Sequence, residues 1–233
     1  MQHCAAEPPE PLRCCEVAAE LACAGGPRPT MLGGVTTSEQ DAAYAILDEG
    51  LVAHVGFVVD NQPFVVPMAY GRDGDRLLLH ASVASRFART LANGAPVCVT
   101  VTLLDGLVIA RSQFHHSMNY RSVMVVGEAR RIADPTEAEA ALVTLVDHII
   151  PGRSSEARPG NRVEHRRTAV LAVPLDSASL KVRSGGPTDE PEDIATGGWA
   201  GVIPLQIGVG APVPDDLSTD LGIPPSIASF RRP

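Results

Sequence analysis

The sequence predicts a mainly β protein, an antiparallel β-barrel with helices packed on its outside. Between residues 51 and 183, short runs rich in Val, Leu and Phe alternate with turn-forming residues, which is typical of strands joined in hairpin order. Helical patterns are few, so the strands do not follow a βαβ order. Aromatic residues make up only 4% of the 233 residues, so Val, Leu, Ile and Ala must build the core.

The first expected elements are one helix and three strands. Thr37 and Ser38 are N-cap residues, and Gly50 is a residue at which a helix ends, so we expect a helix from there to about Asp48. The strands that follow are expected over 51–60, 63–70 and 76–80, with turn residues between them.

A second helix is expected over about 84–93, because Gly94 follows it. Strands over 96–103 and 107–114 come next. Asp105-Gly106 stands between these two runs and is a strong hairpin signal, so we expect a hairpin there. Another long strand is expected over 119–132.

Asp134-Pro135 predicts the start of a helix that continues to Ile150, because Asp is an N-cap residue and Pro favours the first turn. We expect a loop over 152–162 and final strands over 168–175 and 179–183. The chain divides into an expected disordered or loosely attached leader, one barrel domain and a C-terminal tail, over 1–35, 36–206 and 207–233.

Charge and hydropathy exclude some function classes. The formal net charge of −8 argues against a nucleic-acid partner, which favours a basic surface. No window approaches the roughly 18 consecutive apolar residues of a membrane span, and the N-terminus lacks the pattern of a secretory signal. We therefore expect a cytoplasmic protein that contacts neither nucleic acid nor membrane.

The cysteines do not predict a metal site. Four of the five lie in the leader: Cys4, Cys14, Cys15 and Cys23. They could be zinc ligands together with His3, but structural zinc sites usually pair cysteines as CxxC, a spacing that is absent here. Incidental thiols in an Ala- and Pro-rich extension are the simpler interpretation. Cys98 lies in an apolar strand pattern, as a small buried hydrophobe does.

The first candidate site is the strand-to-helix stretch from His80 to Arg86. Backbone N–H groups at a helix start form an anion site. Two hydroxyls and a guanidinium, from Ser82, Ser85 and Arg86, add donors that suit a phosphate. The alternative is a capped surface helix with solvated arginines.

Two further candidates lie later in the chain. Residues 115–122 place polar side chains at the start of a Val-rich strand, where they could line a ligand cleft. Alternate residues point to opposite faces, so the neighbours His115 and His116 are a weak metal signal. Trp199, the only tryptophan, could cover a planar ligand or anchor the tail on the core. GxGxxG, GxxxxGK[ST] and GxSxG patterns are absent.

Taken together, these stretches resemble the pyridoxamine-phosphate-oxidase-like flavin-binding proteins, which share a split β-barrel. The resemblance covers about residues 38–205 and is greatest to the flavin-nucleotide-binding branch, akin to nitroimidazole-resistance proteins. The most specific run is Phe114 to Val123. The other matching segments are 54–58, 63–67, 73–80, 84–86, 96–102, 104–108, 181–183 and 199–202.

The resemblance implies a homodimer with FMN, or a related flavin, bound at the subunit interface. Backbone of Val65, Val66 and Pro67 would run along the isoalloxazine ring. Arg121 and Ser122 would line the cofactor cleft, where they could reach the flavin of the partner, and Trp199 would approach the ring. The ribityl chain and phosphate would be held by His80, Ala81, Ser82, Ser85 and Arg86.

The sequence departs from the vitamin-B6 oxidases at the substrate side. In those enzymes the helix-start arginine is followed by lysine, whereas Phe87 follows Arg86 here. Met68 and Ala69 occupy the strand on which the oxidases carry a basic residue for the substrate. A second anion pocket is therefore not predicted, and oxidation of pyridoxamine phosphate is not supported.

The function that follows is a flavin-dependent oxidoreductase acting on a small molecule, because flavin carries the hydride chemistry itself. Four residues are candidate proton donors: His80, His115, His116 and Tyr120. Two alternatives stay open. One is a non-catalytic protein that binds or carries flavin, deazaflavin or haem, since split-barrel relatives use all three. The other is a dimer with an empty cleft.

Overall fold

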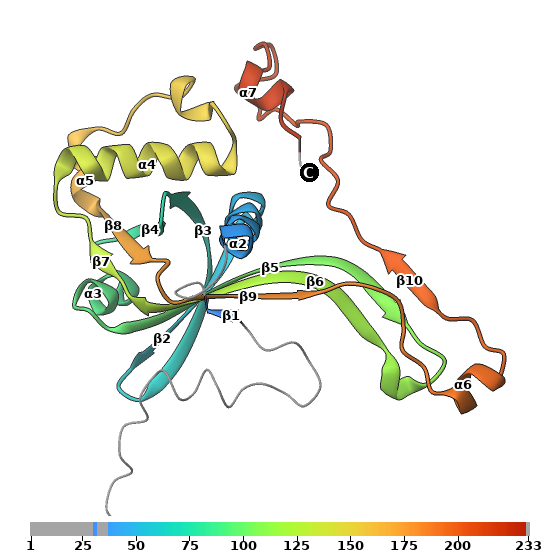
Figure 1. Ribbon diagram of the computed structural model, residues 1–233. Coiled ribbons are helices and arrows are strands. Elements are labelled where there is room, and N and C mark those ends of the chain that lie inside the picture. Colours follow the sequence, from blue (N-terminus) through green and yellow to red (C-terminus); the bar gives the residue numbers. More distant parts are fainter. Residues whose placement is uncertain (1–29, 32–36, 232–233) are drawn as a thin grey trace, which may run out of the picture.

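A computed structural model describes residues 30–31 and 37–231 and has at its centre a strongly curled antiparallel sheet (Figure 1). The strand order is β1-β9-β6-β5-β2-β3-β4-β8-β7, and β10 pairs with β5. Every adjacent pair is antiparallel. The predicted fold class, a mainly β split barrel with flanking helices, is confirmed.

The strands are short at the ends of the sheet and long in its centre. Their bounds are β1 Thr30–Met31, β2 Val52–Val59, β3 Gln62–Asp73, β4 Arg76–Ser82, β5 Pro96–Ile109, β6 Ser117–Glu128, β7 Arg130–Arg131, β8 Thr168–Pro174, β9 Ala178–Arg183 and β10 Gly201–Pro204.

The helices flank the sheet on both of its faces. Their bounds are α2 Thr37–Glu49, α3 Arg86–Ala92, α4 Pro135–Ile149, α5 Arg162–Arg167, α6 Pro191–Ala195 and α7 Pro225–Ala228, with 3-10 turns η2 Gln113–His115 and η3 Arg153–Ser155. The expected N-cap Asp134 of α4 is found, where it accepts from the backbone N–H of Glu137, and Ser85 caps α3 in the same way by accepting from the N–H of Ala88.

The inner face of the sheet forms the main core, because alternate strand residues point to it. Helix α2 packs on this face through Ala43, Ile46 and Leu47. The strands supply the rest, including Val55, Phe57, Tyr70, Leu77, Leu79, Val99, Val101, Val123, Val125, Leu171 and Val173. As predicted, aliphatic side chains make up most of this core.

The outer face of the sheet is covered at one end by α4. Leu78 and Val170 pack against Leu145 there. Gly71 lets the helix approach closely, since a Cβ at Gly71 would lie 3.3 Å from Leu145 Cα. An ion pair between Arg76 and Glu137 adds to the contact. Beyond α4 the outer face carries exposed or half-buried side chains.

The molecule has two regions, which we call the body and the arm (Figure 1). The body is the curled part of the sheet from β2 to β8 with α2, α3 and α4. The arm consists of the outer parts of β5 and β6 with β10 and α6. Strand β10 pairs with β5 at Ile109 to Gly106, farther along the same strand than the segment that pairs with β2.

The predicted hairpin at Asp105-Gly106 is wrong, because β5 is one strand that continues through both residues. They form an irregularity at which the register with β6 shifts between Leu104 and Gly106, as at a β-bulge. A Cβ at Gly106 would lie 3.0 Å from Ile203 O. This glycine therefore allows β10 to approach. Because β10 lies about 100 residues later in the chain, a local turn pattern cannot predict that contact.

Other bounds differ from the expectations. The predicted helix over 84–93 begins at Arg86, and the long strand expected over 119–132 is divided into β6 and β7. The loop expected over 152–162 contains η3, and its end forms the N-cap of α5.

The ends of the chain carry elements that were not predicted. Thr30–Met31 pairs with β9, whereas the rest of the expected leader lies outside the described residues. The expected tail contains α7, where Ser226 N–H donates to Glu156 Oε1 at 2.9 Å. The division of the chain into leader, domain and tail stays a prediction.

Candidate functional site

The uncovered part of the outer face, which we call the open face, is the candidate site. Its side chains are exposed or half-buried, and many are small. It consists of Val65 and Pro67 on β3, His80 and Ser82 on β4, His54 and Gly56 on β2, Cys98, Thr100 and Thr102 on β5, and Tyr120, Ser122 and Met124 on β6.

Strand register explains why these side chains share a face. Pro67 lies opposite His54, His54 opposite Thr100, and Thr100 opposite Met124. Directly opposite residues of antiparallel strands point to the same side. The result is a row that crosses four strands of one surface. Val65, with 66% exposure, begins a neighbouring row.

The stretch from His80 to Arg86 forms one border of the open face. His80 and Ser82 alternate with Leu79 and Ala81, so the first two point outward and the last two inward. Both hydroxyls organise the turn into α3. The N–H of Ala84 donates to Ser82 Oγ at 3.3 Å, and that of Ala88 donates to Ser85 Oγ at 3.0 Å.

Arg86 begins α3 next to this turn. Its guanidinium carbon lies 5.7 Å from the centroid of the Phe64 ring, a cation–π distance. Within residues 37–231 no carboxylate pairs with Arg86. Within the described residues the stretch therefore has a positive charge that no carboxylate pairs with, close in sequence to the hydroxyls of Ser82 and Ser85, and these are donors that suit an anion.

Phe87, the departure from the vitamin-B6 oxidases, has a structural role. Its ring contacts Phe57 edge-on, with centroids 5.3 Å apart, and it packs against the main core. The position that carries lysine in those oxidases is thus an inward aromatic anchor of α3.

Ser122 and Tyr120 form the opposite border of the open face. Ser122 Oγ lies 2.9 Å from Thr102 Oγ1 and donates to Val101 O at 3.1 Å. The ring of Tyr120 lies 5.7 Å from the ammonium of Lys181. A hydroxyl pair and a cation are therefore available at this border.

Arg121 points the other way, onto the inner face. Its guanidinium binds the carboxylates of Asp105 and Glu49, at 2.8 Å and 2.6 Å for the shortest contacts. These hydrogen bonds, first from Asp105 and then from Glu49, raise the pKa of Arg121. The structure thus gives Arg121 a bracing role between α2 and the β5 irregularity. Val66 also has the inward parity, together with Phe64 and Met68.

The segments that carry His115, His116 and Trp199 belong to the arm: η2 connects β5 to β6, and residue 199 lies between α6 and β10 (Figure 1). His115 Nε2 is 4.0 Å from Glu190 Oε1, and His116 Nδ1 is 2.9 Å from Ser112 O. Within one chain the predicted residues therefore form two groups, one on the body and one on the arm.

An ion pair between Arg111 and Asp189 holds the segment that leads to Trp199. Arg111 donates to Asp189 through both its backbone N–H and its guanidinium, at 2.9 Å and 2.8 Å. Burial opposes ionisation of Asp189, but these hydrogen bonds outweigh it and lower the pKa of its carboxyl group. The side chain of Asp189 is only 1% exposed.

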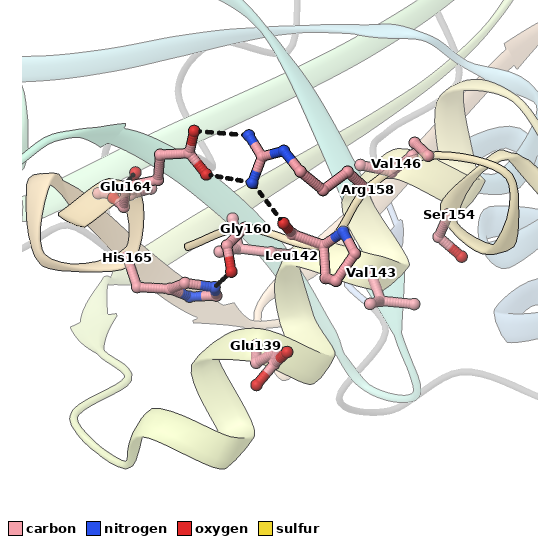
Figure 2. A pocket seen from close by; sticks show the side chains of 12 residues that line it. Glu139, Leu142, Val143, Val146, Ser154, Arg158, Gly160, Glu164 and His165 are labelled. Atoms are coloured by element: carbon pink, nitrogen blue, oxygen red, sulfur yellow. Dashed lines mark hydrogen bonds and ion pairs between the residues drawn. The ribbon is translucent and has the colours of Figure 1, made fainter. Parts of the chain in front are cut away.

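A separate pocket of about 180 Å³ lies between α4 and the segment that leads into β8 (Figure 2). Leu142, Val143 and Val146 give it an apolar wall. Its charged rim residues, Arg158 and Glu164, pair with each other at 2.8 Å. This pairing lowers the pKa of Glu164 to about 2. None of the predicted site residues lines this pocket.

A sequence model described as pyridoxamine 5'-phosphate oxidase matches residues 39–182, more than half of the chain. The chain belongs to this pyridoxamine 5'-phosphate oxidase family. A comparison with curated protein sequences finds no match.

Two solved structures are similar to this family member over nearly their whole length. The FAD and haem binding protein of Mycobacterium smegmatis is 42% identical, with a TM-score of 0.78 over 83% of this chain and 95% of that one. The flavocytochrome Anf3 of Azotobacter vinelandii is 41% identical, with a TM-score of 0.77 over 84% and 95%. A candidate 5-nitroimidazole antibiotic resistance protein of Bacteroides thetaiotaomicron is 25% identical, with a TM-score of 0.53 over 67% and 90%.

The described residues contain no helix that is long and apolar enough to cross a membrane. They also contain no cluster of three or more His, Cys, Asp or Glu side chains able to hold a metal ion.

The sequence analysis missed two residues at this site. His54 lies in the middle of the open face, and Phe64 lies under Arg86. The alternation of β2, in which His54 stands between the buried Ala53 and Val55, was a signal for an outward histidine. The partners of Arg121 had no such signal, because Glu49 lies 72 residues away in the chain.

Proposed function

We propose that this protein binds a flavin nucleotide on the open face, binds haem as well, and acts as an oxidoreductase on a small molecule. The observation that carries the proposal is the open face itself: an uncovered surface of the curled sheet, with hydroxyls and a cation at its border. Two family members with 41% and 42% identity are described as a flavocytochrome and as an FAD and haem binding protein.

The border from His80 to Arg86 is the proposed phosphate end of the flavin site. Arg86 supplies a charge that no carboxylate neutralises within the described residues. Ser82 and Ser85 accept hydrogen bonds from the backbone and keep their own protons for donation to an anion. The sequence favours FMN, but the 42% identical relative binds FAD, so we propose FAD.

The flavin ring is proposed to lie between two copies of the chain. Strand β6 is three strands away from β3 in the sheet order, which is about 14 Å at the usual strand spacing. Val65 and Ser122 are therefore too far apart to contact one ring together from a single chain. A symmetric homodimer would bring β6 of the partner over β3 and would also cover the exposed apolar side chains of this face.

The bound flavin would supply the hydride and electron chemistry. The chain would orient it, exclude water and supply a proton. His80 and Tyr120 are on the open face and are the proposed donors, whereas His115 and His116 lie at the end of the arm. Oxidation of pyridoxamine phosphate is not proposed, because Phe87, Met68 and Ala69 supply no second cation.

The test begins with the protein purified after expression in a haem-sufficient host. We expect flavin absorption, FAD on chromatography of the released cofactor, and a dimer mass by light scattering. Reduced nicotinamide should bleach the flavin, and a nitroaromatic acceptor should restore its colour. Protein that takes up no flavin contradicts the proposal. Bound flavin that no reductant bleaches would instead support a carrier protein and contradict the oxidoreductase assignment.

A further inference from the structure

The outer end of the arm carries an apolar platform on the same face of the sheet as the open face. Ile203 of β10 lies opposite Leu107 of β5, which lies opposite Met118 of β6. Directly opposite side chains point to the same side, and Met118 shares the parity of Tyr120 and Ser122. Met118 is 50% exposed and Ile203 46%. These three side chains therefore form an apolar row that is exposed at Met118 and Ile203 and partly exposed at Leu107.

Trp199 extends this platform by one row. Gly201 lies opposite Ile109, and a Cβ at Gly201 would lie 3.0–3.1 Å from two ring carbons of Trp199. The indole therefore covers the side of Gly201 to which a side chain would point, the side of Ile109 and Ile203. Trp199 is 68% exposed, so its ring forms an accessible edge of the platform.

His116 stands at the edge of the platform with its imidazole in a defined state. It has extended dihedrals, φ −60° and ψ 141°, and lies two residues before Met118, so it shares that residue's face. Its Nδ1 is 2.9 Å from Ser112 O. A carbonyl oxygen only accepts hydrogen bonds, so Nδ1 carries the proton and Nε2 keeps its lone pair. Metal-ligating histidines are usually held in this way.

Two cations border the platform on β9. Arg183 lies opposite Tyr120, and Lys181 opposite Ser122. The guanidinium of Arg183 donates to Asn119 Oδ1 at 2.8 Å. Neither cation pairs with a carboxylate within residues 37–231. The arm and β9 together thus combine an oriented imidazole, an apolar surface and two positive charges.

We propose that His116 is an axial ligand of haem and that the platform of Leu107, Ile109, Met118, Trp199 and Ile203 receives the porphyrin. This inference rests on the haem part of the proposed function. Haem is a flat apolar macrocycle with two carboxylates, and a single histidine suffices to hold its iron. The three parts of the arm match these three properties. Lys181 and Arg183 would pair with the propionates.

Two other histidines with engaged ring nitrogens do not fit. His148 Nε2 is 2.7 Å from Gly50 O, and its ring packs on the buried Tyr70. His165 Nε2 is 2.9 Å from Gly160 O, but that ring lines the pocket of about 180 Å³ in Figure 2, which is too small for a porphyrin. His165 therefore provides a matched control, a histidine held by a carbonyl without a platform.

The experiment compares the wild type, His116→Gly and His165→Ala, each purified as full chain after growth with a haem precursor. Haem is counted by the pyridine haemochromogen method, ligation is followed by the Soret band and by electron paramagnetic resonance, and flavin is counted separately. We expect His116→Gly to lose at least about ten-fold in haem affinity, and added imidazole to restore the wild-type spectrum. His165→Ala should keep the haem affinity and the spectrum of the wild type.

The outcomes separate the inference from the proposed function. Wild type that takes up flavin but no haem contradicts the haem part of the proposed function and this inference with it. Wild type that takes up haem, together with His116→Gly that keeps the same haem content and Soret band, contradicts this inference alone. Because His116 is exposed, the variant should fold, and an unchanged flavin content would verify that it does.

Discussion

The body and the arm are both built from antiparallel strands, but they differ in how far they bury their apolar side chains. In the body, alternate residues of β2, β3 and β4 bury a closed core, with Tyr70, Leu77 and Leu79 fully buried. In the arm, β5, β6 and β10 leave large apolar side chains exposed, and Phe114 is 89% exposed. The hydroxyls Ser82 and Ser85 and the guanidinium of Arg86 lie on the body, whereas exposed rings such as Phe114 and Trp199 lie on the arm.

The body therefore buries much of its apolar surface within the chain, whereas the arm leaves large apolar side chains exposed. Exposed apolar side chains that cluster on one surface usually mark a contact with a partner or ligand. Polar contacts hold the arm instead: Arg121 braces it against α2, and Arg111 fixes the segment that leads to β10.

The largest expected effect is on cofactor binding at the body. Arg86→Ala removes the one guanidinium at the proposed phosphate end, so flavin binding should weaken by about 1.5–3 kcal/mol, the usual value of a charge-assisted hydrogen bond. Fluorescence titration of the apoprotein with FAD measures it. Arg130→Ala, an exposed arginine on β7, is the control. If Arg86→Ala and the wild type bind FAD with equal affinity, Arg86 does not bind the flavin phosphate.

The next effect is on the stability of the body. A Cβ at Gly50 would lie 2.5 Å from Val101 Cγ1 and 2.6 Å from the Tyr70 hydroxyl. Gly50→Ala should therefore lower the free energy of unfolding by about 1–3 kcal/mol, as overpacking does. Urea denaturation measures it. Gly127→Ala on β6 is the control, because a Cβ there meets no atom within 4 Å. Equal free energies of unfolding for the two variants would contradict the prediction that a Cβ at Gly50 overpacks the core.

The smallest effect concerns the bracing of the arm. Arg121→Met removes the guanidinium shared by Asp105 and Glu49, and should lower the free energy of unfolding by about 1 kcal/mol at low salt and by less at high salt. Hydrogen exchange of β5 and β6 should rise near Asp105. Arg158→Met, which breaks a more exposed pair with Glu164, should change stability much less than Arg121→Met does, because solvent screens exposed ion pairs. A loss in Arg121→Met that high salt leaves unchanged would contradict the electrostatic account.

Sequence predicted the body better than the arm, for a physical reason. Strands such as β2 and β4 have regular alternation that is set by local burial, and the cap of α3 at Ser85 is a local signal. The hairpin predicted at Asp105-Gly106 was wrong because the structure around these two residues is set by contacts with residues far away in the chain. Asp105 binds Arg121, and Gly106 allows β10 to approach.

The candidate site was also only partly predictable. His80, Ser82 and Ser122 were predicted as site residues from the segments that match the family in order along the chain. The structure places all three side chains on the open face, which is consistent with that prediction. The inward direction of Arg121 follows from strand parity with Val123, which the sequence does show, but its carboxylate partner on α2 could not be found without the fold. Helix α5 was missed, although Asn161 and Glu164 form a capping box whose spacing is visible in the sequence.

The central claim is that one flavin site is built from the body of one copy and the open-face border of the other. Co-expression of two differently tagged variants tests it, with Arg86→Ala in one chain and Ser122→Asp in the other. Each variant alone should bind flavin poorly. Random pairing into dimers should restore roughly a quarter of the wild-type sites, because a heterodimer then has one intact site. No recovery in the isolated heterodimer would contradict a site shared between subunits.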